Sequence, residues 1–252
     1  MIFLDELYQF LFWGMIFSAP VVFVVLLYVP APYGRYARPG WGPLMDNRLG
    51  WLVMESPACL LMLVPFLFIE ESSLVLFFLF LWQFHYVHRS FVYPFGLKKE
   101  PKIPIIVVVM AFTFNIFNAF INGFYLSQYS AYYDYSWIYS SNFIVGLAFF
   151  LWGFWANKRS DQILYHLKKG KGHENYGVPD QFLYRYISCP NYFSESIQWL
   201  GWAIMTMAPP AWVFFLWTVA NLFPRAVSHH AWYRKKFGAY PKNRKAFIPF
   251  FL

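Results

Sequence analysis

The sequence predicts an all-α integral membrane protein with seven transmembrane helices. Of its 252 residues, 59% are hydrophobic and only 13% are charged, whereas soluble domains carry about 25% charged residues. Apolar stretches long enough to cross a bilayer recur along the whole chain, and the Lys and Arg residues fall in groups between them. Little sequence is left for a separate soluble domain, so residues 1–252 are expected to form a single polytopic membrane domain.

The expected helices follow the apolar stretches in order. The last stretch, from about residue 195 to 224, is too long for one comfortable span. Pro209-Pro210 interrupts it, so we interpret it as two helices that meet at the prolines. The seven expected helices cover residues of about 10–29, 51–69, 74–93, 104–126, 138–156, 195–208 and 211–224.

The distribution of the 20 Lys and Arg residues predicts the topology. They fall into four groups, which lie at or after the ends of the first, third, fifth and seventh expected helices. The amino terminus, the turns at 70–73 and 209–210 and the loop 127–137 contain none. Because basic loops remain in the cytoplasm, the amino terminus is expected outside and the carboxyl terminus inside. The cytoplasmic loops also make up most of the chain outside the membrane, so we expect the chemistry on that side.

Composition and motifs argue against several classes of protein. Topology accounts for the net charge of +8, so no nucleic-acid partner is expected. Cys59 and Cys189 offer no disulfide framework or metal-ligand spacing, and the adjacent His229-His230 is not spaced for a metal on a helix, so no metal is expected. The glycines form no P-loop or dinucleotide fingerprint, so any nucleotide site must be of a non-Rossmann kind. The lipid bilayer is an expected partner of the protein, and the sequence gives no sign of an obligate protein partner.

Glu55 is the most informative single residue. It lies about one helical turn inside the apolar stretch 51–69. A carboxylate at the centre of a membrane helix costs roughly 2.5 kcal/mol or more, and less near the end of the helix. Glu55 is therefore a candidate functional residue, with the alternative that it lies close enough to the interface for its carboxylate to reach water.

Tyr86 is the candidate partner of Glu55. Tyr86, Arg89 and Tyr93 have the spacing of one helical face near the cytoplasmic end of the third expected helix. Glu55 and Tyr86 are expected at similar depths, which allows a carboxyl–phenol contact. A phenol held in this way can donate to a substrate carbonyl and stabilise an enolate-like charge. The alternative is a structural polar contact between the two helices.

Amide and charged side chains form further clusters at helical spacing. Asn115, Asn118 and Asn122 share one face of the fourth expected helix, where they either line a polar cavity or hydrogen-bond to neighbouring helices. Asn157, Asp161 and Lys168 follow the fifth expected helix, and at 3.6 residues per turn they would lie within a narrow arc of the helix surface. An amide, a carboxylate and a cation suit a ribose or a nicotinamide amide plus a phosphate, although a solvated cytoplasmic helix is the alternative.

The segments on the cytoplasmic side resemble those of the steroid 5α-reductase family, the 3-oxo-5α-steroid 4-dehydrogenases. The similarity is clearest in His-Tyr-Val-His-Arg-Ser-Phe-Val-Tyr at 85–93, in Asn-Tyr-Phe-Ser-Glu at 191–195, and in the tail 225–249. Within that tail, Tyr-Pro-Lys-Asn-Arg-Lys-Ala-Phe-Ile-Pro at 240–249 is the most specific stretch. The resemblance runs over nearly the whole chain, includes Tyr33-Gly34-Arg35, and preserves the order and spacing of all segments.

The resemblance implies an NADPH-dependent enzyme that reduces the Δ4 double bond of 3-oxo-Δ4-steroids to 5α-3-oxosteroids. Glu55 and Tyr86 match the catalytic residues that hold the 3-keto oxygen, while hydride adds to C5 and a proton to C4. The implied cofactor-binding positions are Arg35, Arg89, Tyr93, Asn157, Ser160, Asp161, Lys168, Asn191, Glu195, His229, Tyr233 and Arg244. The candidate residues for an apolar, steroid-like substrate are Met54, Glu55, Tyr86, Asn115 and Asn118.

Four positions depart from the pattern of the animal enzymes. Met54 replaces a Gln beside the substrate carbonyl, Gln198 replaces an acidic residue, and Lys168 replaces an Arg. The histidine run is reduced to Ser228-His229-His230. These changes are compatible with the same chemistry and leave the steroid preference and the NADPH contacts open.

Two other enzyme classes fit parts of the sequence. A trans-2-enoyl-CoA reductase of lipid metabolism shares the carboxyl-terminal pattern, and a membrane methyltransferase of the related fold needs no Glu–Tyr pair. The short termini favour a bacterial member of the family in the inner membrane, with the endoplasmic reticulum as the location if the source is eukaryotic.

Overall fold

The computed structural model describes residues 2–68, 73–97, 102–170 and 177–251. The secondary structure of these residues is mainly helical. It also includes two short strands that pair antiparallel, β1 (Leu44–Met45) and β2 (Ile103–Pro104), and an isolated parallel bridge between Ile187 and Lys245. The α-helices are α1 (Ile2–Tyr28), α2 (Asn47–Leu63), α3 (Ser73–Val87), α4 (Tyr93–Gly96), α5 (Ile105–Gln128), α6 (Ser141–Gly170), α7 (Pro190–Thr206) and α8 (Pro209–Lys236). A π-helical turn, η3 (His88–Val92), joins α3 to α4, and short 3-10 turns include η1 (Gly34–Tyr36), η2 (Pro65–Phe68) and η6 (Phe182–Arg185).

Seven transmembrane helices were predicted, and the described residues do form seven long helices, but several boundaries were wrong. The first expected helix was placed at about residue 10, whereas α1 begins at Ile2, with Asp5 in a first turn that favours acidic side chains. The second was expected to reach about residue 69, but α2 ends at Leu63 and the 3-10 turn η2 begins at Pro65, which lacks a backbone N–H. Helices α6 and α8 continue to Gly170 and Lys236, beyond their expected ends at about residues 156 and 224. The expected ends were taken from the apolar stretches, and a helix can continue past the end of such a stretch.

Three helices in the described residues are long and apolar enough to cross a membrane by themselves. They are Ile2–Tyr28, Asn47–Leu67 and Ile105–Gln128. Helices α3 and α7 have 15 and 17 residues, whereas an average span needs about 20. The chain is thus a multi-pass membrane protein.

The described chain divides into two compact units, each considered by itself. Unit 1 comprises the residues up to Ile16, Ala31–Ser141 and Ala208–Val213. Unit 2 comprises Phe17–Pro30, Asn142–Met207 and the residues from Phe214 onward. The expectation of one polytopic domain over residues 1–252 stays a prediction.

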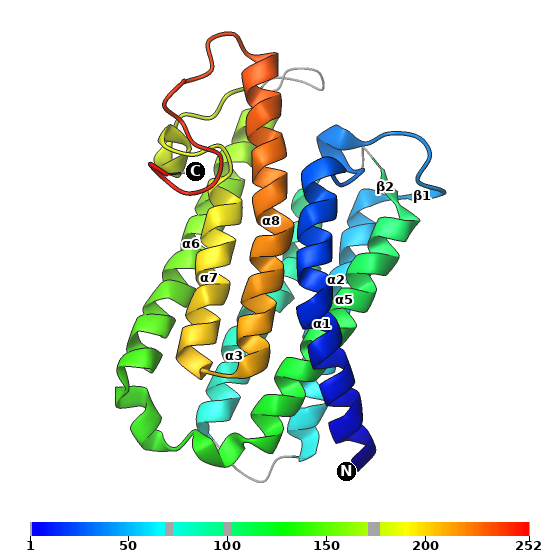
Figure 1. Ribbon diagram of the computed structural model, residues 1–252. Helices are drawn as coiled ribbons and strands as arrows, with labels where there is room; N and C mark the ends of the chain where they lie inside the picture. The colour runs from blue at the N-terminus through cyan, green and yellow to red at the C-terminus, as the bar shows by residue number, and fades with distance from the viewer. Residues whose placement is uncertain (1, 69–72, 98–101, 171–176, 252) are drawn as a thin grey trace. The chain divides into compact units, whose positions relative to one another are not determined.

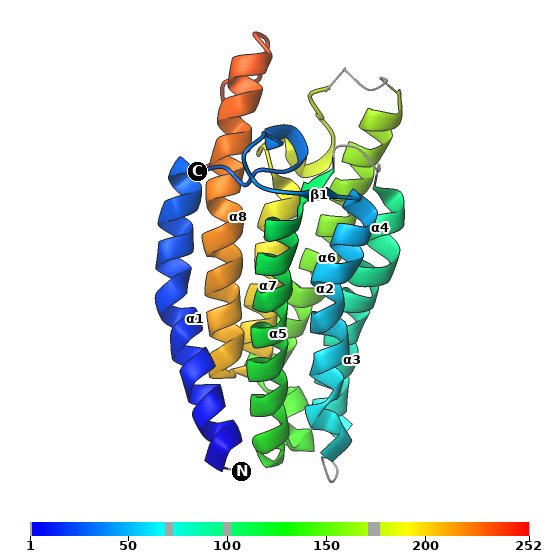
Figure 2. The same ribbon diagram turned by 90° about the vertical axis from the view of Figure 1, so that its right-hand side faces the viewer.

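In unit 1, α2 packs against α5 and α3 (Figures 1 and 2). The indole of Trp82 on α3 donates to the carbonyl of Ala58 on α2 at 2.8 Å. Cys59 and Gln83 exchange two hydrogen bonds, each 2.9 Å long. These contacts fix the register of α3 on α2 and so determine where the next turn of α3, which carries Tyr86, is placed.

In unit 2, α6, α7 and α8 run side by side (Figure 1). Trp199 and Trp202 of α7 are fully buried, and Phe150 of α6 packs on both. Trp199 also contacts Phe214 of α8, with ring centroids 4.3 Å apart. Aromatic residues thus form the centre of this unit.

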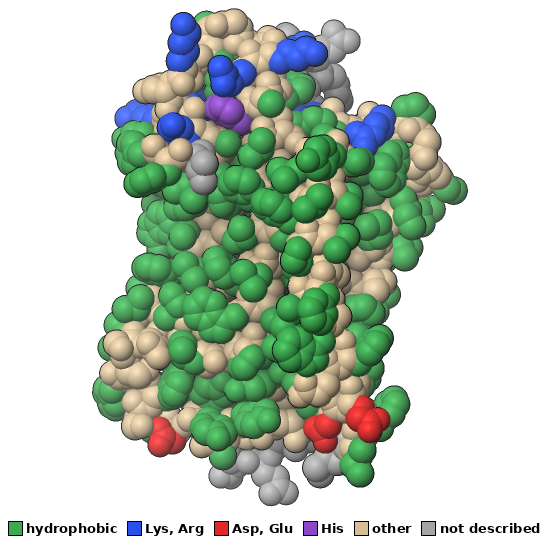
Figure 3. All heavy atoms as spheres, viewed as in Figure 1, with side chains coloured by type: hydrophobic (Ala, Val, Ile, Leu, Met, Phe, Trp, Pro, Cys, Tyr) green, Lys and Arg blue, Asp and Glu red, His purple; other side chains and the backbone are tan. Residues whose placement is uncertain are grey.

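The outer surfaces of the helices are apolar. Large side chains such as Phe10, Phe17 and Phe80 are exposed on α1 and α3, and Figure 3 shows hydrophobic side chains over most of the visible helical surface. In unit 2 the visible Lys and Arg side chains gather around the end of α8 and the tail that follows it (Figure 3). An exposed apolar surface of this extent suits lipid contact.

Candidate active site

Glu55 lies on α2 with its carboxylate held by two partners. The helix is capped by Asp46, whose side chain accepts from the backbone N–H groups of Arg48 and Leu49. One carboxylate oxygen of Glu55 lies 3.6 Å from Nε of Arg89. The other accepts a hydrogen bond from the amide of Asn115 on α5 at 3.3 Å. The side chains of Arg89 and Glu55 are 15% and 14% exposed, so this is a mostly buried ion pair.

The π-helical turn η3 determines how Arg89 is placed. Its guanidinium lies over the rings of Trp51 and Tyr93, at 4.6 and 4.8 Å from the two centroids. The sequence predicted the α-helical spacing of Tyr86, Arg89 and Tyr93, but residues 88–92 form a π turn that inserts one extra residue per turn. Such turns are frequent at functional sites. Arg89, expected to contact the cofactor, is the ion-pair partner of Glu55, and Trp51 is a contact that the sequence analysis missed.

Tyr86 lies in the last turn of α3 and is 3% exposed. Its ring packs against Trp82 and His85, with a centroid distance of 4.9 Å to each. Trp82 is in turn bonded to α2, as described above. The direct contact between Tyr86 and Glu55 stays a prediction.

The three asparagines of α5 are all buried, as expected of a polar helical face. Asn115 donates to the carbonyl of Met54 at 2.6 Å as well as to Glu55. Asn122 donates to both oxygens of Asn118 at 3.0 Å. The side-chain nitrogen of Asn118, which is 0% exposed, has no hydrogen-bond partner among the described residues. A buried donor of this kind favours a ligand or water that can accept.

In unit 2, side chains of α6 and α7 form an amide–carboxylate cluster. Asn157 donates to the carbonyl of Asn191 at 2.9 Å and to the carboxylate of Glu195 at 3.3 Å. The amide of Asn191 donates to Asp161 at 3.3 Å. Four residues that the resemblance assigned to cofactor binding are thus brought together from two helices.

Ser160, which precedes Asp161 on α6, and Tyr184 lie next to this cluster. The hydroxyl of Ser160 donates to the carbonyl of Ala156 at 2.7 Å, within its own helix. Tyr184 of η6 is fully buried, and its hydroxyl donates to the carbonyl of Ser160 at 3.4 Å. Burial, followed by the nearby carboxyl group of Asp161, raises the pKa of Tyr184 well above its ordinary value of 10.0. Tyr184 therefore remains a neutral donor, which the sequence analysis did not predict.

His229 belongs to a second cluster, between α7 and α8. Its Nε2 lies 3.2 Å from the hydroxyl of Tyr192. Arg225 donates to the same hydroxyl at 3.0 Å and lies over the Tyr192 ring. Tyr192 and Arg225 were not among the predicted site residues; their only signal was membership in the segments that carry the resemblance.

A third cluster surrounds Arg244 in the carboxyl-terminal tail. Arg244 is 4% exposed, and its guanidinium lies 4.9 Å from the ring centroid of Tyr240 and donates through Nη1 to the carbonyl of Pro179 at 3.0 Å. Its Nε has no hydrogen-bond partner in the described ranges. Tyr240 stacks on Tyr233 of α8, with centroids 5.3 Å apart and planes inclined by 11°.

His230 lies beside this third cluster. Burial, followed by the positive charges of Arg234, Arg244 and Lys245, lowers the pKa of His230 below its ordinary value of 6.5. The unfolded chain therefore takes up a proton at this residue at a higher pH than the folded chain does. The stability that neutral His230 contributes is expected to be fully present above about pH 6.5 and to be lost as the pH falls toward the lower folded value.

Thermal unfolding in detergent between about pH 8 and pH 5 measures this effect. His230→Gln removes the titrating group, so the midpoint of the variant is expected to fall less steeply with decreasing pH than that of the wild type. Parallel curves for the two proteins would exclude His230 as a source of the pH dependence.

Two predicted cofactor residues lie outside these clusters and outside the group around Glu55. Arg35 is part of η1, a turn that begins at Gly34 with φ of +62°, a conformation that favours glycine. Lys168 lies on α6, but its side chain is outside the described part of the structure.

Comparisons with known proteins agree on one family. A model of the family described as 3-oxo-5-alpha-steroid 4-dehydrogenase matches residues 101–252. The chain is 41% identical to the steroid 5-alpha-reductase DET2 of Arabidopsis thaliana over 94% of its own length and 93% of the relative. It is 37% identical to the 3-oxo-5-alpha-steroid 4-dehydrogenase 1 of Bos taurus, covering 91% of both chains. The corresponding human protein is 34% identical over 86% of this chain and 85% of its own.

These relatives come from plants and mammals, so they do not support the expectation of a bacterial source. The identity extends over nearly the whole chain, and the family model covers more than half of it. The chain therefore belongs to the steroid 5α-reductase family and is an oxidoreductase, a 3-oxo-5-alpha-steroid 4-dehydrogenase.

Proposed function

We propose that this enzyme uses NADPH to reduce the Δ4 double bond of 3-oxo-Δ4-steroids, with Tyr86 and Glu55 acting on the C3 ketone. The observation that carries the proposal is the placement of the Glu55 carboxylate, which Arg89 and Asn115 hold from two other segments. The alternative, a Glu55 carboxylate that extends to water at the interface, would not require these two partners. Two fixed contacts preorganise it for a role in chemistry.

Tyr86 is the proposed hydrogen-bond donor to the ketone. When bound, NADPH supplies the hydride that adds to C5. The π electrons of the C4–C5 bond then shift toward C3, and negative charge develops on the ketone oxygen. The phenol of Tyr86 stabilises that charge, and Glu55 orients the phenol. The carbonyl re-forms as C4 takes up a proton. Met54 lies beside Glu55 and presents an apolar side chain, and Asn115 and Asn118 complete the proposed substrate contacts.

The residues present fit an anionic dinucleotide. Arg244 is a nearly fully buried cation whose Nε–H has no hydrogen-bond partner among the residues described, and guanidinium groups bind phosphate well. The amides of Asn157 and Asn191 are already oriented by carboxylates, which suits recognition of a carboxamide or a ribose. The full proposed set is Arg35, Arg89, Tyr93, Asn157, Ser160, Asp161, Lys168, Asn191, Glu195, His229, Tyr233 and Arg244.

The predicted topology has the amino terminus outside and the carboxyl terminus in the cytoplasm. Under this proposal all seven long helices span the bilayer, and the cofactor reaches a non-Rossmann site from the cytoplasm. The basic residues between the helices support this orientation. Because the relatives named above are eukaryotic, we propose the endoplasmic reticulum membrane in place of a bacterial inner membrane.

A substrate comparison with purified protein tests the proposal. The enzyme in detergent is given NADPH with testosterone or progesterone, and then NADPH with a trans-2-enoyl-CoA. Steroid-dependent oxidation of NADPH with formation of the 5α-3-oxosteroid is expected. Reduction of the enoyl-CoA alone would favour the lipid-metabolism alternative. Methyl transfer from S-adenosylmethionine without NADPH oxidation would favour the methyltransferase.

A further inference from the structure

The hydroxyl of Ser188 connects three segments of unit 2, namely the loop before α7, helix α8 and the carboxyl-terminal tail. Its Oγ lies 2.6 Å from Nδ1 of His230 on α8 and 2.6 Å from the hydroxyl of Tyr240 in the tail. It also lies 3.1 Å from the carbonyl oxygen of Lys245. Ser188 is 3% exposed, so these contacts are shielded from solvent. Ser188 was not among the site residues predicted from the sequence.

The number of protons determines how these contacts are shared. A serine hydroxyl has one hydrogen to donate and two lone pairs to accept with. The carbonyl of Lys245 can only accept, so Ser188 donates to it. All three contacts are then hydrogen bonds only if Tyr240 and His230 both donate to Oγ. In this arrangement His230 carries its proton on Nδ1, and the hydroxyl of Ser188 is fully used.

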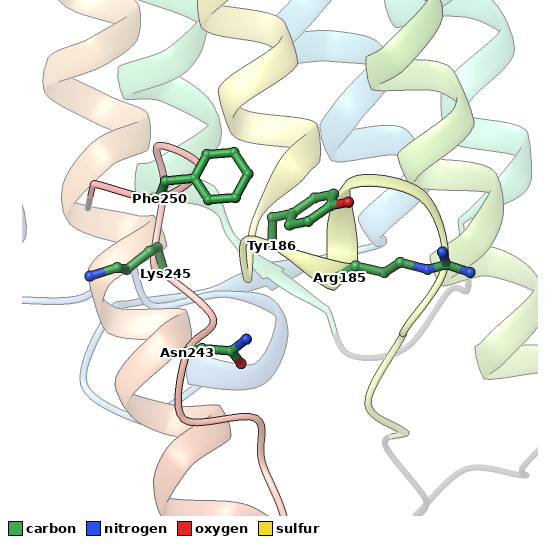
Figure 4. A pocket seen from close by; sticks show the side chains of 5 residues that line it. All are labelled: Arg185, Tyr186, Asn243, Lys245 and Phe250. Carbon is green, nitrogen blue, oxygen red and sulfur yellow. The ribbon is translucent and has the colours of Figure 1, made fainter.

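The backbone reinforces the same junction. The N–H of Ser188 donates to the carbonyl of Lys245, and the N–H of Lys245 donates to the carbonyl of Tyr186, both at 2.9 Å. Tyr186 packs on Phe250 with ring centroids 5.3 Å apart. Figure 4 shows these two rings close together and Lys245 in the same carboxyl-terminal tail as Phe250. The tail is therefore held at Lys245 by two backbone hydrogen bonds and at Phe250 by a ring contact.

Ser188 thus sets the surroundings of two proposed cofactor residues. Arg244 immediately precedes Lys245, and its guanidinium lies over the Tyr240 ring. Tyr233 stacks on that ring as well, and the ring of His230 lies edge-on to it with centroids 5.8 Å apart. Removing the hydroxyl of Ser188 would remove its hydrogen bond with the Tyr240 phenol and its hydrogen bond with the carbonyl of Lys245 in the tail.

We propose that Ser188 is a positioning residue for the cofactor, holding Tyr240 and the tail so that Arg244 and Tyr233 are presented to the phosphate and ribose portion of NADPH. The inference rests on the proposed cofactor role of Arg244 and Tyr233. Ser188 itself need not touch the cofactor, because its one hydrogen and two lone pairs are already occupied.

Direct binding of NADPH to purified protein tests this inference. We expect Ser188→Ala to weaken NADPH binding about tenfold to hundredfold, measured by calorimetry and as a smaller NADPH-induced rise in the unfolding temperature. The KM for the steroid is expected to change less than about twofold, since no substrate contact is altered. Ser188→Thr keeps the hydroxyl and is expected to restore most of the affinity.

Tyr240→Phe is the second variant, in case Ser188→Ala fails to fold. It removes the phenol hydroxyl from Ser188 but keeps the ring that stacks on Tyr233, and NADPH binding is expected to weaken in the same direction. The matched control is Ser196→Ala, because Ser196 is also buried in unit 2 and its hydroxyl donates within its own helix, to the carbonyl of Tyr192 at 3.0 Å. Its NADPH affinity is expected to stay at the wild-type level.

Arg244→Leu separates failure of this inference from failure of the proposed function. If Arg244→Leu weakens NADPH binding while Ser188→Ala and Tyr240→Phe bind as the wild type does, the role of Ser188 is wrong and that of Arg244 stands. If Arg244→Leu also binds NADPH normally, the assignment of Arg244 is wrong and the inference falls with it. Failure of Ser188→Thr to restore affinity would likewise overturn the positioning role.

Discussion

Tyr86→Phe is expected to lower kcat for steroid reduction by about 10²–10³-fold, because it removes the one phenol proposed to stabilise negative charge on the ketone oxygen. The loss should appear in kcat and in kcat/KM alike, since the hydrogen bond strengthens as charge develops. The ring contacts with Trp82 and His85 are retained in the variant, so folding is expected to be unaffected. NADPH oxidation during steroid turnover and direct NADPH binding are the two measurements.

Glu55→Gln is expected to lower the same rate by about 10²–10⁴-fold, because the phenol loses its charged partner. This substitution also leaves Arg89, which is 15% exposed, without its ion-pair partner, so part of the loss can come from stability. Unfolding temperatures distinguish the two contributions.

Buried Tyr133 of unit 1 provides the matched control for both variants. Tyr133→Phe removes a buried phenol hydroxyl from a residue outside the proposed site, and it is expected to keep the wild-type rate. If Tyr86→Phe and Glu55→Gln retained more than half of the wild-type kcat, the catalytic assignment would be wrong.

Gly201→Leu is expected to prevent stable folding of unit 2, because α6 and α7 approach each other closely at this residue. A Cβ at Gly201 would meet the backbone nitrogen of Phe150 and would lie 2.6 Å from the carbonyl oxygen of Gly146. Added atoms in a packed core typically cost 1–3 kcal/mol and occasionally more, and here the contact is with backbone that cannot rotate away. Gly201→Ala is therefore expected to lower the unfolding temperature measurably, and the Leu variant to be recovered in poor yield.

Two more glycines show that this close approach extends along both helices. A Cβ at Gly153 of α6 would lie 2.5 Å from the backbone nitrogen of Gln198, and one at Gly146 would lie 2.6 Å from Cα of Met205. Gly14 of α1 is the matched control, since a Cβ there meets nothing within 4 Å. Gly14→Ala is expected to be neutral or slightly stabilising, because Ala is favoured over Gly in a helix by about 1 kcal/mol. Equal effects at Gly14 and Gly201 would contradict the packing argument.

The catalytic candidates show how far residue patterns reach. Glu55 was identified because a carboxylate in an apolar helix is costly wherever the helix packs. Its partners were not identified in the same way: Arg89 was assigned to the cofactor, whereas the structure pairs it with Glu55. The π turn at residues 88–92 re-aims that side chain, and a π turn has no reliable signature in the sequence.

Ser188 and Tyr184 illustrate the second limit. Ser188 is a single polar residue in a loop and Tyr184 lies in the short 3-10 turn η6, and no periodic pattern distinguishes either from solvent-exposed residues. Their importance arises from contacts with residues 24 to 57 positions away in the chain. Sequence spacing carries no information about such contacts.

The sequence by itself determined the class of the protein, the number of long helices and the family, because hydropathy, charge distribution and a run of matched segments are properties of the chain alone. It also singled out Glu55, and the family resemblance placed Asn157, Asp161, Asn191 and Glu195 within one larger set of expected cofactor-binding positions. The tertiary structure decided the partners: Arg89 and Asn115 on Glu55, Ser188 at the junction of the tail, and glycine at the contact of α6 and α7. These depend on side-chain direction and backbone approach between distant segments, which arise only when the helices pack.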